Sequence, residues 1–322
     1  HQELKELADE GVTYTIMEAS SHGLHQGRMA ALSFDVAGFT NLTRDHLDYH
    51  KTFEDYFNAK MILFRHNLKE GGTAVLNADI ECFGRIVAIC EQRGQKIISY
   101  GFGGQDIKLL SATPLEYGQK LDIDYFGQPK TIEIPLVGEF QAMNVLCALG
   151  MLAAMTGLPD DVINYIDKIK GAKGRLELVA HTPNGAAVYI DYAHTPDGLE
   201  NVLKALRPHT PGRLHVVFGC GGNRDKGKRP LMGKIAHDLA DVVYVTDDNP
   251  RFEEAEDIRN EIMPACQGAY NIADRAKAIK FAVERLMPGD VLVVAGKGHE
   301  TGQYIKGKIH HFSDHEEILK NI

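Results

Sequence analysis

Residues 219–230 form the loop whose composition is best suited to chemistry. The sequence GCGGNRDKGKRP holds four glycines and places four cationic side chains within six residues, in a chain of net charge −9. Glycines let a backbone approach a ligand closely, and clustered cations attract an anion. The loop lacks the GxGxxG and GK[ST] spacings, so it matches neither a dinucleotide fingerprint nor a Walker motif. An anion site is the interpretation we favour, and a merely solvated basic loop is the alternative.

Two later segments offer charges of opposite sign that suit an amino acid. Residues 247–251 (DDNPR) and 296–300 (GKGHE) each follow a predicted strand. An arginine such as Arg251 can pair with a carboxylate through two parallel hydrogen bonds, and Glu300 can pair with an ammonium group. Functional groups gather at the carboxyl ends of strands in open α/β sheets. We therefore expect these segments and the Arg224 loop to form adjacent parts of one site.

The segment Asp191-Tyr192-Ala193-His194-Thr195-Pro196-Asp197 predicts the start of a helix. Thr195 suits the N-cap, Pro196 the first helical position and Asp197 the first turn. These residues alone leave open whether Asp191 and His194 also contact a ligand.

The first half of the chain contains a second polar cluster. Glu18 ends a predicted strand and is followed by two serines, while His46 lies in the polar stretch 41–50 after the next strand. If these strands pair, a carboxylate and an imidazole there could hold a divalent cation. A helix N-cap and a surface loop are the alternatives. Lys60 lies within a predicted helix, and by itself indicates only a solvated lysine.

Alternation of short apolar strands with helices predicts parallel sheets of βαβ units. In the first half, helices are expected at 2–10, 53–65, 79–93, 140–156 and 159–170, and strands at 13–18, 35–40, 73–77 and 96–100. Residues 107–136 instead predict antiparallel hairpins, with turns at Gly118 and Gly127.

A second open α/β sheet is expected after the Gly-rich, basic linker 170–175. Its strands are predicted at 186–191, 213–218, 241–246 and 290–294, and its helices at 197–207, 230–239, 255–264 and 273–286.

Composition excludes several classes of protein. The chain has 322 residues, which suggests about two domains, and 44% hydrophobic with 25% charged residues is a globular balance. Its acidity argues against general nucleic-acid or membrane-surface binding. No apolar run approaches ~18 residues, and residues 1–15 show no signal-peptide pattern. Five scattered cysteines (Cys82, Cys90, Cys147, Cys220 and Cys266) without a CxxC pair predict a reduced, cytoplasmic protein.

Eight motifs, in this order, resemble those of the Mur ligases of peptidoglycan synthesis. The motifs are EASSHGLHQGR (18–28), NLTRDHLDYH (41–50), the AK of FNAKMILF (59–60), GRLE (174–177), DYAHTPDGL (191–199), GCGGNRDKGKRP (219–230), DNPR (248–251) and GKGHE (296–300). The resemblance covers essentially the whole chain. It implies a central ATP-binding α/β domain (1–173), mainly a parallel sheet with small antiparallel hairpins, and a C-terminal Rossmann-like α/β domain (174–322) that binds the incoming amino acid.

The resemblance also implies a function and a set of site residues. The expected reaction adds meso-2,6-diaminopimelate to the D-Glu of UDP-MurNAc-L-Ala-D-Glu, with ATP and Mg²⁺, through an acyl phosphate. The positions that match the UDP-MurNAc-dipeptide site are Ser20, Gln26 and Arg28. Those that match magnesium ligands with a catalytic role are Glu18, His46 and Lys60, the last as a carbamate. Those around ATP are Asn144, Arg175, Asp191 and His194. Those of the diaminopimelate pocket are Arg224, Asp248, Asn249, Pro250, Arg251, Gly296 and Glu300.

DNPR marks the diaminopimelate type within the family. Diaminopimelate carries a second carboxylate that Arg251 can pair, whereas L-lysine offers nothing there. An unpaired guanidinium would cost about 2–5 kcal/mol, or ~30-fold or more in selectivity. Alternatives are an L-lysine-adding ligase of the same family, a folylpolyglutamate synthetase, a nucleotide-binding dehydrogenase, or a binding module without activity. The DNPR and GCGGNRDKGKRP strings argue against the synthetase, and the lack of GxGxxG argues against the dehydrogenase.

Family members carry a uridine-binding domain and a P-loop ahead of the position that matches His1. We therefore expect this chain to be a truncated ligase that does not turn over ATP alone, because the P-loop backbone and lysine would hold the phosphates. The family expectation is a monomer.

Overall fold

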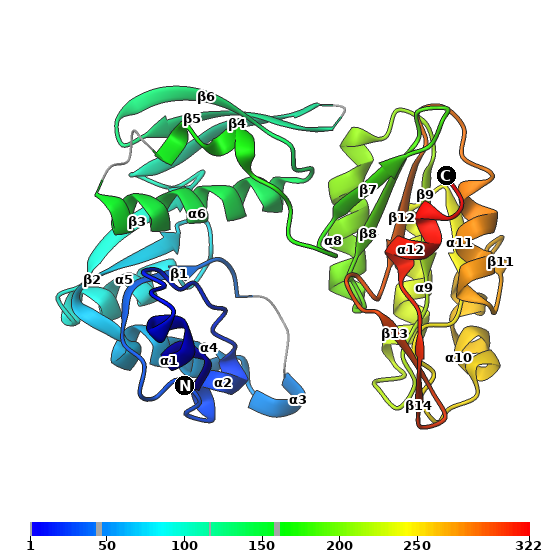
Figure 1. The fold of residues 1–322 in the computed structure, drawn as a ribbon, viewed down its shortest axis with the longest axis horizontal. Coiled ribbons are helices and arrows are strands. Elements are labelled where there is room, and N and C mark those ends of the chain that lie inside the picture. The colour runs from blue at the N-terminus through cyan, green and yellow to red at the C-terminus, as the bar shows by residue number, and fades with distance from the viewer. Residues whose placement is uncertain (1, 43–46, 116, 158–161) are drawn as a thin grey trace. The chain divides into compact units, whose positions relative to one another are not determined.

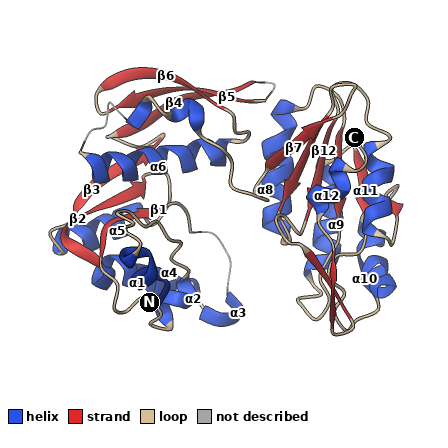
Figure 2. Ribbon diagram, in the orientation of Figure 1, coloured by secondary structure: helices blue, strands red, loops and turns tan. Residues whose placement is uncertain are grey.

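The computed structural model describes residues 2–42, 47–115, 117–157 and 162–322, and it divides the chain into two compact units. The first unit contains residues 1–109, 124–128 and 143–163, and the second contains 110–123, 129–142 and 164–322. Both are mixed α/β structures, as expected (Figure 2). Each unit is described here by itself.

Parallel strands form the core of the first unit. β1 (Phe34–Phe39), β2 (Leu68–Asn77) and β3 (Lys96–Gly101) pair in that order. Helices α4 (Phe53–Ile62) and α5 (Phe83–Gln92), with the π-turn η1 (Leu63–Asn67), pack their apolar side chains against these strands. The predicted βα alternation over 35–100 is therefore confirmed.

Close packing explains two glycines in this unit. α6 (Glu139–Thr156) lies against the sheet through its later turns. A Cβ at Gly38 would lie 2.7 Å from the Met151 sulfur, and a Cβ at Gly150 would lie 2.8 Å from Val75. Distances below 3 Å are not found for real Cβ atoms, so only glycine lets this helix and the strands approach so closely.

The strand predicted over residues 13–18 is wrong. These residues lie between α1 (Gln2–Asp9) and α2 (Ser21–His25) without regular structure. Their apolar side chains are exposed, with Tyr14 at 66% and Ile16 at 82%. A strand needs a neighbour to satisfy its ladder of hydrogen bonds, and among the described residues β1 pairs only with β2. Alternating apolar residues alone did not provide that partner.

The predicted strands with turns at Gly118 and Gly127 are confirmed. β4 (Ile107–Leu115), β5 (Gly118–Tyr125) and β6 (Gln128–Ile134) follow β3 in the strand order of the first sheet. Gly127 has a φ of +81°, and a Cβ at Gly118 would lie 2.3 Å from the Ile134 carbonyl oxygen. The helix predicted at 159–170 falls partly on residues 158–161, outside the described residues. Its described remainder contains the 3₁₀ turn η2 (Ile166–Lys168), and α3 (Leu47–His50) was not predicted.

The second unit is an open sheet with the strand order β11-β10-β9-β12-β8-β7. Its strands are β7 (Glu177–His181), β8 (Ala187–Asp191), β9 (Leu214–Phe218), β10 (Val242–Val245), β11 (Tyr270–Asn271) and β12 (Val291–Ala295). β7 is antiparallel to β8, and the other pairs are parallel. The four strands predicted for this unit are confirmed, and the edge strands β7 and β11 were not predicted.

Helices cover both faces of this sheet (Figure 1). α8 (Pro196–Leu206), α9 (Lys228–Leu239) and α10 (Ala255–Ile262) pack on one face, and α11 (Arg275–Val283) and α12 (Asp314–Leu319) pack on the other. Short 3₁₀ turns follow two of these helices, η3 (Arg207–His209) and η4 (Met263–Ala265). Side chains along β12 alternate between the two cores, which explains why the strand is apolar at every position.

A β-hairpin beyond β12 was also not predicted. β13 (Gly302–Ile305) and β14 (Lys308–His311) are antiparallel and joined by Lys306 and Gly307. Both turn residues have positive φ, +45° and +84°, as a tight two-residue hairpin turn requires. Lys-Gly is a weaker signal than Asn-Gly or Asp-Gly at such a turn, so the hairpin was missed.

One described helix, α6, is long and apolar enough to span a membrane by length and composition, although the sequence showed no apolar run of that length. In the structure 44% of it is buried. The core helices of soluble proteins pass the same test, so this is weak evidence for a membrane span.

Histidine 215 provides a pH-dependent contribution to stability. Its ring is 1% exposed and lies 3.1 Å from Asp290 Oδ2 and 3.2 Å from the Tyr244 hydroxyl. Burial lowers the pKa of His215 below its ordinary value of 6.5. Burial alone would raise the pKa of Asp290, but hydrogen bonds from the Arg213 and Met287 amides and the charge of His215 bring it below 3.8.

We predict that the unfolding free energy falls as the pH drops below about 6.5. In that range the unfolded state binds a proton at His215 that the folded state does not, and below pH 4 Asp290 adds a loss in the same direction. Urea unfolding at pH 7.0 and 5.5 measures this slope. His215→Gln should flatten it, whereas His237→Gln, a change at an exposed histidine of α9, should not. An equal slope in His215→Gln and wild type would contradict the assignment.

Candidate functional site

Four loops leave the carboxyl ends of β8, β9, β10 and β12, which are parallel and adjacent in the second sheet. They contain residues 192–195, 219–227, 246–254 and 296–301. All of the site residues predicted from Asp191 onward lie in these loops or at the strand ends themselves. The strand-end rule therefore placed the second-unit residues on one edge of one sheet.

Glycines bring the loops after β9 and β10 into direct contact. A Cβ at Gly219 would lie 2.2 Å from the Thr246 carbonyl oxygen, and one at Gly222 would lie 2.0 Å from that of Pro250. The Gly222 amide donates to the Asn249 carbonyl oxygen at 2.9 Å. These glycines were predicted to admit an anion, but in the structure two of them admit the neighbouring loop.

The hairpin β13–β14 makes hydrogen bonds with residues 248–251. The Tyr304 amide donates to Asn249 Oδ1 at 2.9 Å, and the Gln303 side chain donates to the Asp248 carbonyl oxygen at 2.6 Å. The Arg251 amide donates to the Tyr304 carbonyl oxygen at 3.0 Å. These contacts fix the backbone of Asp248 and Arg251 and the side chain of Asn249.

Lys297 is the centre of the polar cluster. Its side chain is fully buried, and its ammonium group donates to Asn249 Oδ1 at 3.0 Å and to Glu300 Oε2 at 3.1 Å. It also lies 3.8 Å from Asp248 Oδ1, a buried oxygen with no hydrogen bond. Asn249 Nδ2 donates to Glu300 Oε2 at 3.1 Å. The structure thus brings together three predicted residues, Asp248, Asn249 and Glu300, around a cation that was not predicted.

This arrangement leaves one oxygen of Glu300 available. Both described donors, Lys297 and Asn249, use Oε2, and no described residue donates to Oε1. The Glu300 side chain is 34% exposed. It is a carboxylate of fixed orientation with one open oxygen, which suits an ammonium group. Nearby, Gly296 has a φ of +118°, a conformation that favours glycine.

Arg251 reaches back toward the loop after β9. Its backbone is left-handed, with a φ of +55°, and its Nη1 donates to the Gly222 carbonyl oxygen at 2.9 Å. A Cβ at Gly221 would lie 2.7 Å from this Nη1. The absence of a side chain at Gly221 therefore leaves room for the Arg251 guanidinium. The remaining N–H groups of Arg251 can donate to a carboxylate. Pro250 is buried beside it.

The end of the loop after β9, where α9 begins, is held by ion pairs with the loop after β10 and with α10. Arg229 is fully buried and pairs with Glu253 at 3.0 Å and Glu261 at 2.9 Å. Lys228 donates to the His194 carbonyl oxygen at 2.8 Å. Arg224 is exposed, and the structure does not place its side chain against the other predicted residues of the part that it describes.

The turn after β8 is tied to the backbone. Both oxygens of the buried Asp191 accept backbone amides, from Leu176 at 2.6 Å and from Ala193 at 2.7 Å. Burial raises the pKa of Asp191 despite these hydrogen bonds. The predicted N-cap is confirmed, since Thr195 Oγ1 accepts the Gly198 amide at 3.1 Å.

Next to this turn, polar and aromatic groups form an open surface. The Arg175 guanidinium lies 4.5 Å from the centre of the Tyr192 ring, and the exposed His194 ring lies 4.7 Å from it. Arg175 is exposed as well. Stacked cationic and aromatic groups of this kind suit a flat, anionic ligand.

The predicted residues of the first unit are less closely grouped. Ser20 is the N-cap of α2, and its Oγ accepts the Gly23 amide at 3.1 Å, so the capping alternative is confirmed for it. Gln26 donates to the Tyr49 hydroxyl at 3.3 Å. Glu18 and Arg28 are exposed.

Two further residues of the first unit lie on helices. The ammonium group of Lys60, on α4, lies 5.1 Å from the centre of the Tyr56 ring and 5.9 Å from that of Phe39. Asn144 is an exposed residue of α6. His46 lies outside the described residues. Within the described ranges no three His, Cys, Asp or Glu side chains are grouped to hold a metal ion.

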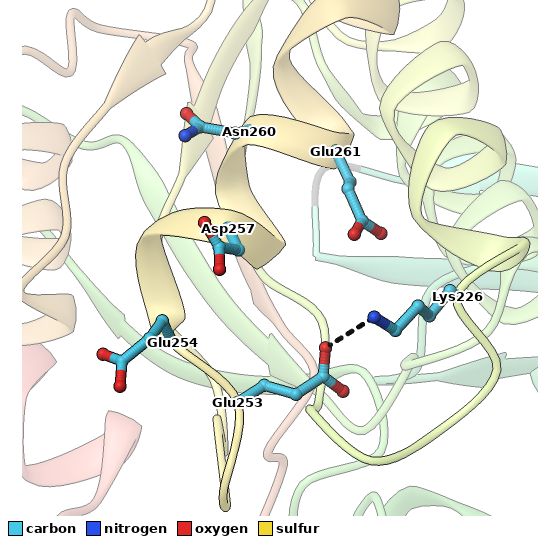
Figure 3. Close-up of a pocket in the computed structure, with 6 residues that line it drawn as sticks. All are labelled: Lys226, Glu253, Glu254, Asp257, Asn260 and Glu261. Atoms are coloured by element: carbon cyan, nitrogen blue, oxygen red, sulfur yellow. Dashed lines mark ion pairs between the residues drawn. The ribbon is translucent and has the colours of Figure 1, made fainter.

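A cavity of about 420 Å³ lies between the loops after β9 and β10 and helix α10 (Figure 3). Its lining residues are Lys226, Glu253, Glu254, Asp257, Asn260 and Glu261. Four carboxylates against one ammonium group make it unsuitable for phosphate or carboxylate ligands. None of the predicted site residues lines it, so we place the candidate site at the strand ends rather than in this cavity.

Sequence reasoning missed the residues that support the site. Lys297 stands inside the GKGHE string but was given no role, and Glu253 follows DNPR by two positions. Arg275 and Asp314 form a fully buried ion pair at 2.7 Å, and Arg275 also donates to the carbonyl oxygen of Ala295 at the end of β12. A basic residue between two glycines after an apolar strand was the one local signal for Lys297.

Comparison with known proteins places the chain in a family. Residues 1–152 match the Mur ligase middle domain, and residues 174–298 match the Mur ligase, glutamate ligase domain. UDP-N-acetylmuramoyl-L-alanyl-D-glutamate--2,6-diaminopimelate ligase of Agrobacterium fabrum is 50% identical over 99% of this chain and 65% of its own length. The enzyme of the same name from Caulobacter vibrioides is 50% identical over 98% of this chain and 65% of its own length. The chain thus spans about 65% of the length of these curated relatives.

Solved structures agree in fold. A structure of a ligase with the same name has a TM-score of 0.69 at 37% identity, covering 99% of this chain and 66% of its own. MurF ligase from Thermotoga maritima, solved with ADP, has a TM-score of 0.68 at 20% identity over 94% of this chain and 64% of its own. Folylpolyglutamate synthase of Mycobacterium tuberculosis has a TM-score of 0.67 at 21% identity, covering 83% of this chain and 62% of its own. At this identity the likeness shows the fold alone. With middle and C-terminal domain matches over most of its length and relatives at 50% identity, the chain belongs to the Mur ligase family.

Proposed function

We propose that this chain provides the central and amino-acid-binding domains, residues 1–173 and 174–322, of a ligase that adds meso-2,6-diaminopimelate to UDP-MurNAc-L-Ala-D-Glu in peptidoglycan precursor synthesis. The observation that carries this is the cluster at the strand ends. There the open oxygen of Glu300 and the guanidinium of Arg251 offer partners for an ammonium group and a carboxylate. The names of the relatives at 50% identity support the same substrates.

The reaction would proceed in two steps. The D-glutamyl γ-carboxylate attacks the γ-phosphorus of ATP, and ADP leaves with the electrons of the broken P–O bond. The amine of diaminopimelate then attacks the acyl carbon of the acyl phosphate, loses a proton and expels phosphate. Catalysis of this kind depends mainly on positioning and on stabilising the anionic groups.

The strand-end residues would hold the unreactive end of diaminopimelate. Glu300 would bind its ammonium group and Arg251 its carboxylate, while Asp248 and Asn249 keep Lys297 and Glu300 in place. Gly296, Pro250 and Arg224 would complete the pocket. L-Lysine has an amine for Glu300 but no carboxylate for Arg251, so Arg251 would discriminate between the two amino acids.

Arg175, Asp191 and His194 would contribute to ATP binding, and Asn144 is a further residue predicted to contact ATP. The Arg175–Tyr192 stack and the exposed His194 support this assignment, and the structural role of Asp191 is to shape the turn. Ser20, Gln26 and Arg28 would bind the UDP-MurNAc-dipeptide.

Magnesium would be held by Glu18, His46 and a carbamylated Lys60. Carboxylate and carbamate oxygens are the donors that Mg²⁺ prefers, so Glu18 and a carbamylated Lys60 fit this ion. Bound magnesium would neutralise charge among the phosphates and carboxylates. A cytoplasmic location suits a chain whose five cysteines are all free. A monomer without nucleic-acid or membrane partners stays a prediction.

We predict that the chain binds meso-diaminopimelate about 30-fold more tightly than L-lysine. In the unliganded site Arg251 already donates to the Gly222 carbonyl oxygen, so leaving it without a carboxylate costs about 2 kcal/mol, the low end of the range. Isothermal titration calorimetry with both amino acids, in the presence of Mg²⁺ and ATP, measures the ratio. Arg251→Ala should bring the ratio close to one. A ratio near one in the wild type would overturn the role assigned to Arg251, and a ratio well below one would favour the L-lysine-adding alternative.

A second prediction concerns the glycine that makes room for Arg251. Gly221→Ala should displace the guanidinium, because the new Cβ would lie 2.7 Å from Nη1. The far end of a flexible side chain can move, so we expect a loss of stability below about 1 kcal/mol but a several-fold loss of selectivity for diaminopimelate. Gly84→Ala on α5 is the control, since no described atom beyond its chain neighbours and its own helix backbone lies within 4 Å of its Cβ position. Unchanged selectivity in Gly221→Ala would contradict the placement of Arg251.

A further inference from the structure

The basic loop contains more positive charge than the substrate site uses. Arg224, Lys226, Lys228 and Arg229 lie within six residues, with Asp225 as the only acid among them. Cations held this closely repel one another, so an ordered loop needs an internal anion. Three of the four have partners: Lys228 has the His194 carbonyl oxygen, and Lys226 and Arg229 have Glu253.

Glu253 acts on this loop at several points. Its Oε1 accepts the Asn223 amide at 2.5 Å, both oxygens accept Arg229 Nη2 at 3.0 Å, and Oε2 lies 3.3 Å from Lys226 Nζ (Figure 3). The Glu253 side chain is 17% exposed. The Asn223 amide, then Arg229, hold the pKa of this carboxyl below its usual value, so it is ionised at neutral pH.

The contact is reciprocal. Asn223 has a left-handed backbone, with a φ of +52°, and its Oδ1 accepts the Phe252 amide at 3.0 Å. One position earlier, Gly222 donates to the Asn249 carbonyl oxygen and accepts from Arg251. The loops after β9 and β10 are therefore joined from Gly222 to Asn223, and Glu253 closes this junction.

Arg224 follows the junction directly. It makes no hydrogen bond or ion pair with another residue in the part of the chain that the structure describes, and it is exposed. Glu253 pairs with Lys226 and Arg229, and Lys228 is bound to the His194 carbonyl oxygen. Arg224 is therefore the cation of the loop that has no partner among the described residues and can meet a ligand.

We propose that Glu253 is a positioning residue of the amino-acid site: it anchors the basic loop through Asn223 and Arg229 and thereby holds Arg224 ready for a carboxylate of the incoming amino acid. The substrate half of this proposal rests on the proposed function. The anchoring half rests only on contacts within the second unit.

The chain offers a matched control at the next position. Glu254 lines the same cavity as Glu253, but it is exposed, and among the described residues its carboxylate pairs with the exposed Lys306 alone, at 2.9 Å. Glu253→Gln and Glu254→Gln remove the same charge at neighbouring positions. The Gln variant at 253 retains an acceptor for the Asn223 amide, and Arg229 retains Glu261.

Two measurements on the 322-residue chain test the proposal. Amide hydrogen exchange reports the order of residues 219–229, and calorimetry with meso-diaminopimelate reports the affinity. We expect Glu253→Gln to speed exchange over 219–229 at least 10-fold and to weaken binding about 10-fold, with Glu254→Gln within 2-fold of wild type in both. Arg224→Gln should weaken binding as much without altering exchange. The double variant Arg224→Gln/Glu253→Gln should bind no more weakly than Arg224→Gln, because Glu253 acts through Arg224.

Each part of the proposal is contradicted by a different result. Wild-type exchange rates in Glu253→Gln would overturn the anchoring role, and additive losses in the double variant would show that Glu253 acts independently of Arg224. A wild-type chain that does not bind meso-diaminopimelate would contradict the proposed function and the role of Arg224, while the exchange rates still decide the anchoring. If Glu253→Gln does not fold, Glu253→Asp, whose shorter side chain cannot reach the Asn223 amide and Arg229 in the same way, should speed exchange in the same segment, and wild-type exchange rates there would overturn the anchoring role.

Discussion

The buried ammonium group of Lys297 holds the carboxyl edge of the second sheet in its arrangement. It binds Asn249 and Glu300 and is the cation nearest to the buried carboxylate of Asp248. A carboxylate without a compensating charge is costly to bury, and breaking a buried pair by removing one partner costs about 3–5 kcal/mol. The loops after β10 and β12 depend on this group. The orientation of the Asn249 amide and the open oxygen of Glu300 both follow from it.

The charges of this edge are divided between support and recognition. Arg275 and Arg229 are fully buried, and each is paired with carboxylates of its own unit. Arg275 also fixes the last carbonyl of β12, directly before Gly296. Arg224 and part of the Arg251 guanidinium make no ion pair among the described residues. In the proposed function, internal ion pairs would thus determine which cations of this acidic protein meet an anionic substrate.

The sequence predicted the strands and the strand-end residues of the site, but it did not reveal the buried residues that hold them in place. Strands that are apolar at every position, such as β12, are typical of the buried centre of an α/β sheet, and the ends of the predicted strands located Asp248, Arg251 and Glu300. The predicted strand at 13–18 was wrong because alternation does not supply a pairing partner. Lys297 and Glu253 were missed because a buried cation and its acceptors meet only in three dimensions. Roles such as the Lys60 carbamate came from family resemblance and stay predictions.

The most direct test of the account is a crystal structure of the chain with meso-diaminopimelate. The account predicts that an ammonium group of the ligand lies within hydrogen-bond distance of Glu300 Oε1 and that the carboxylate at the same end pairs with Arg251. A ligand bound in the acidic cavity beside α10, or bound at the strand ends without contact to Glu300 and Arg251, would contradict it.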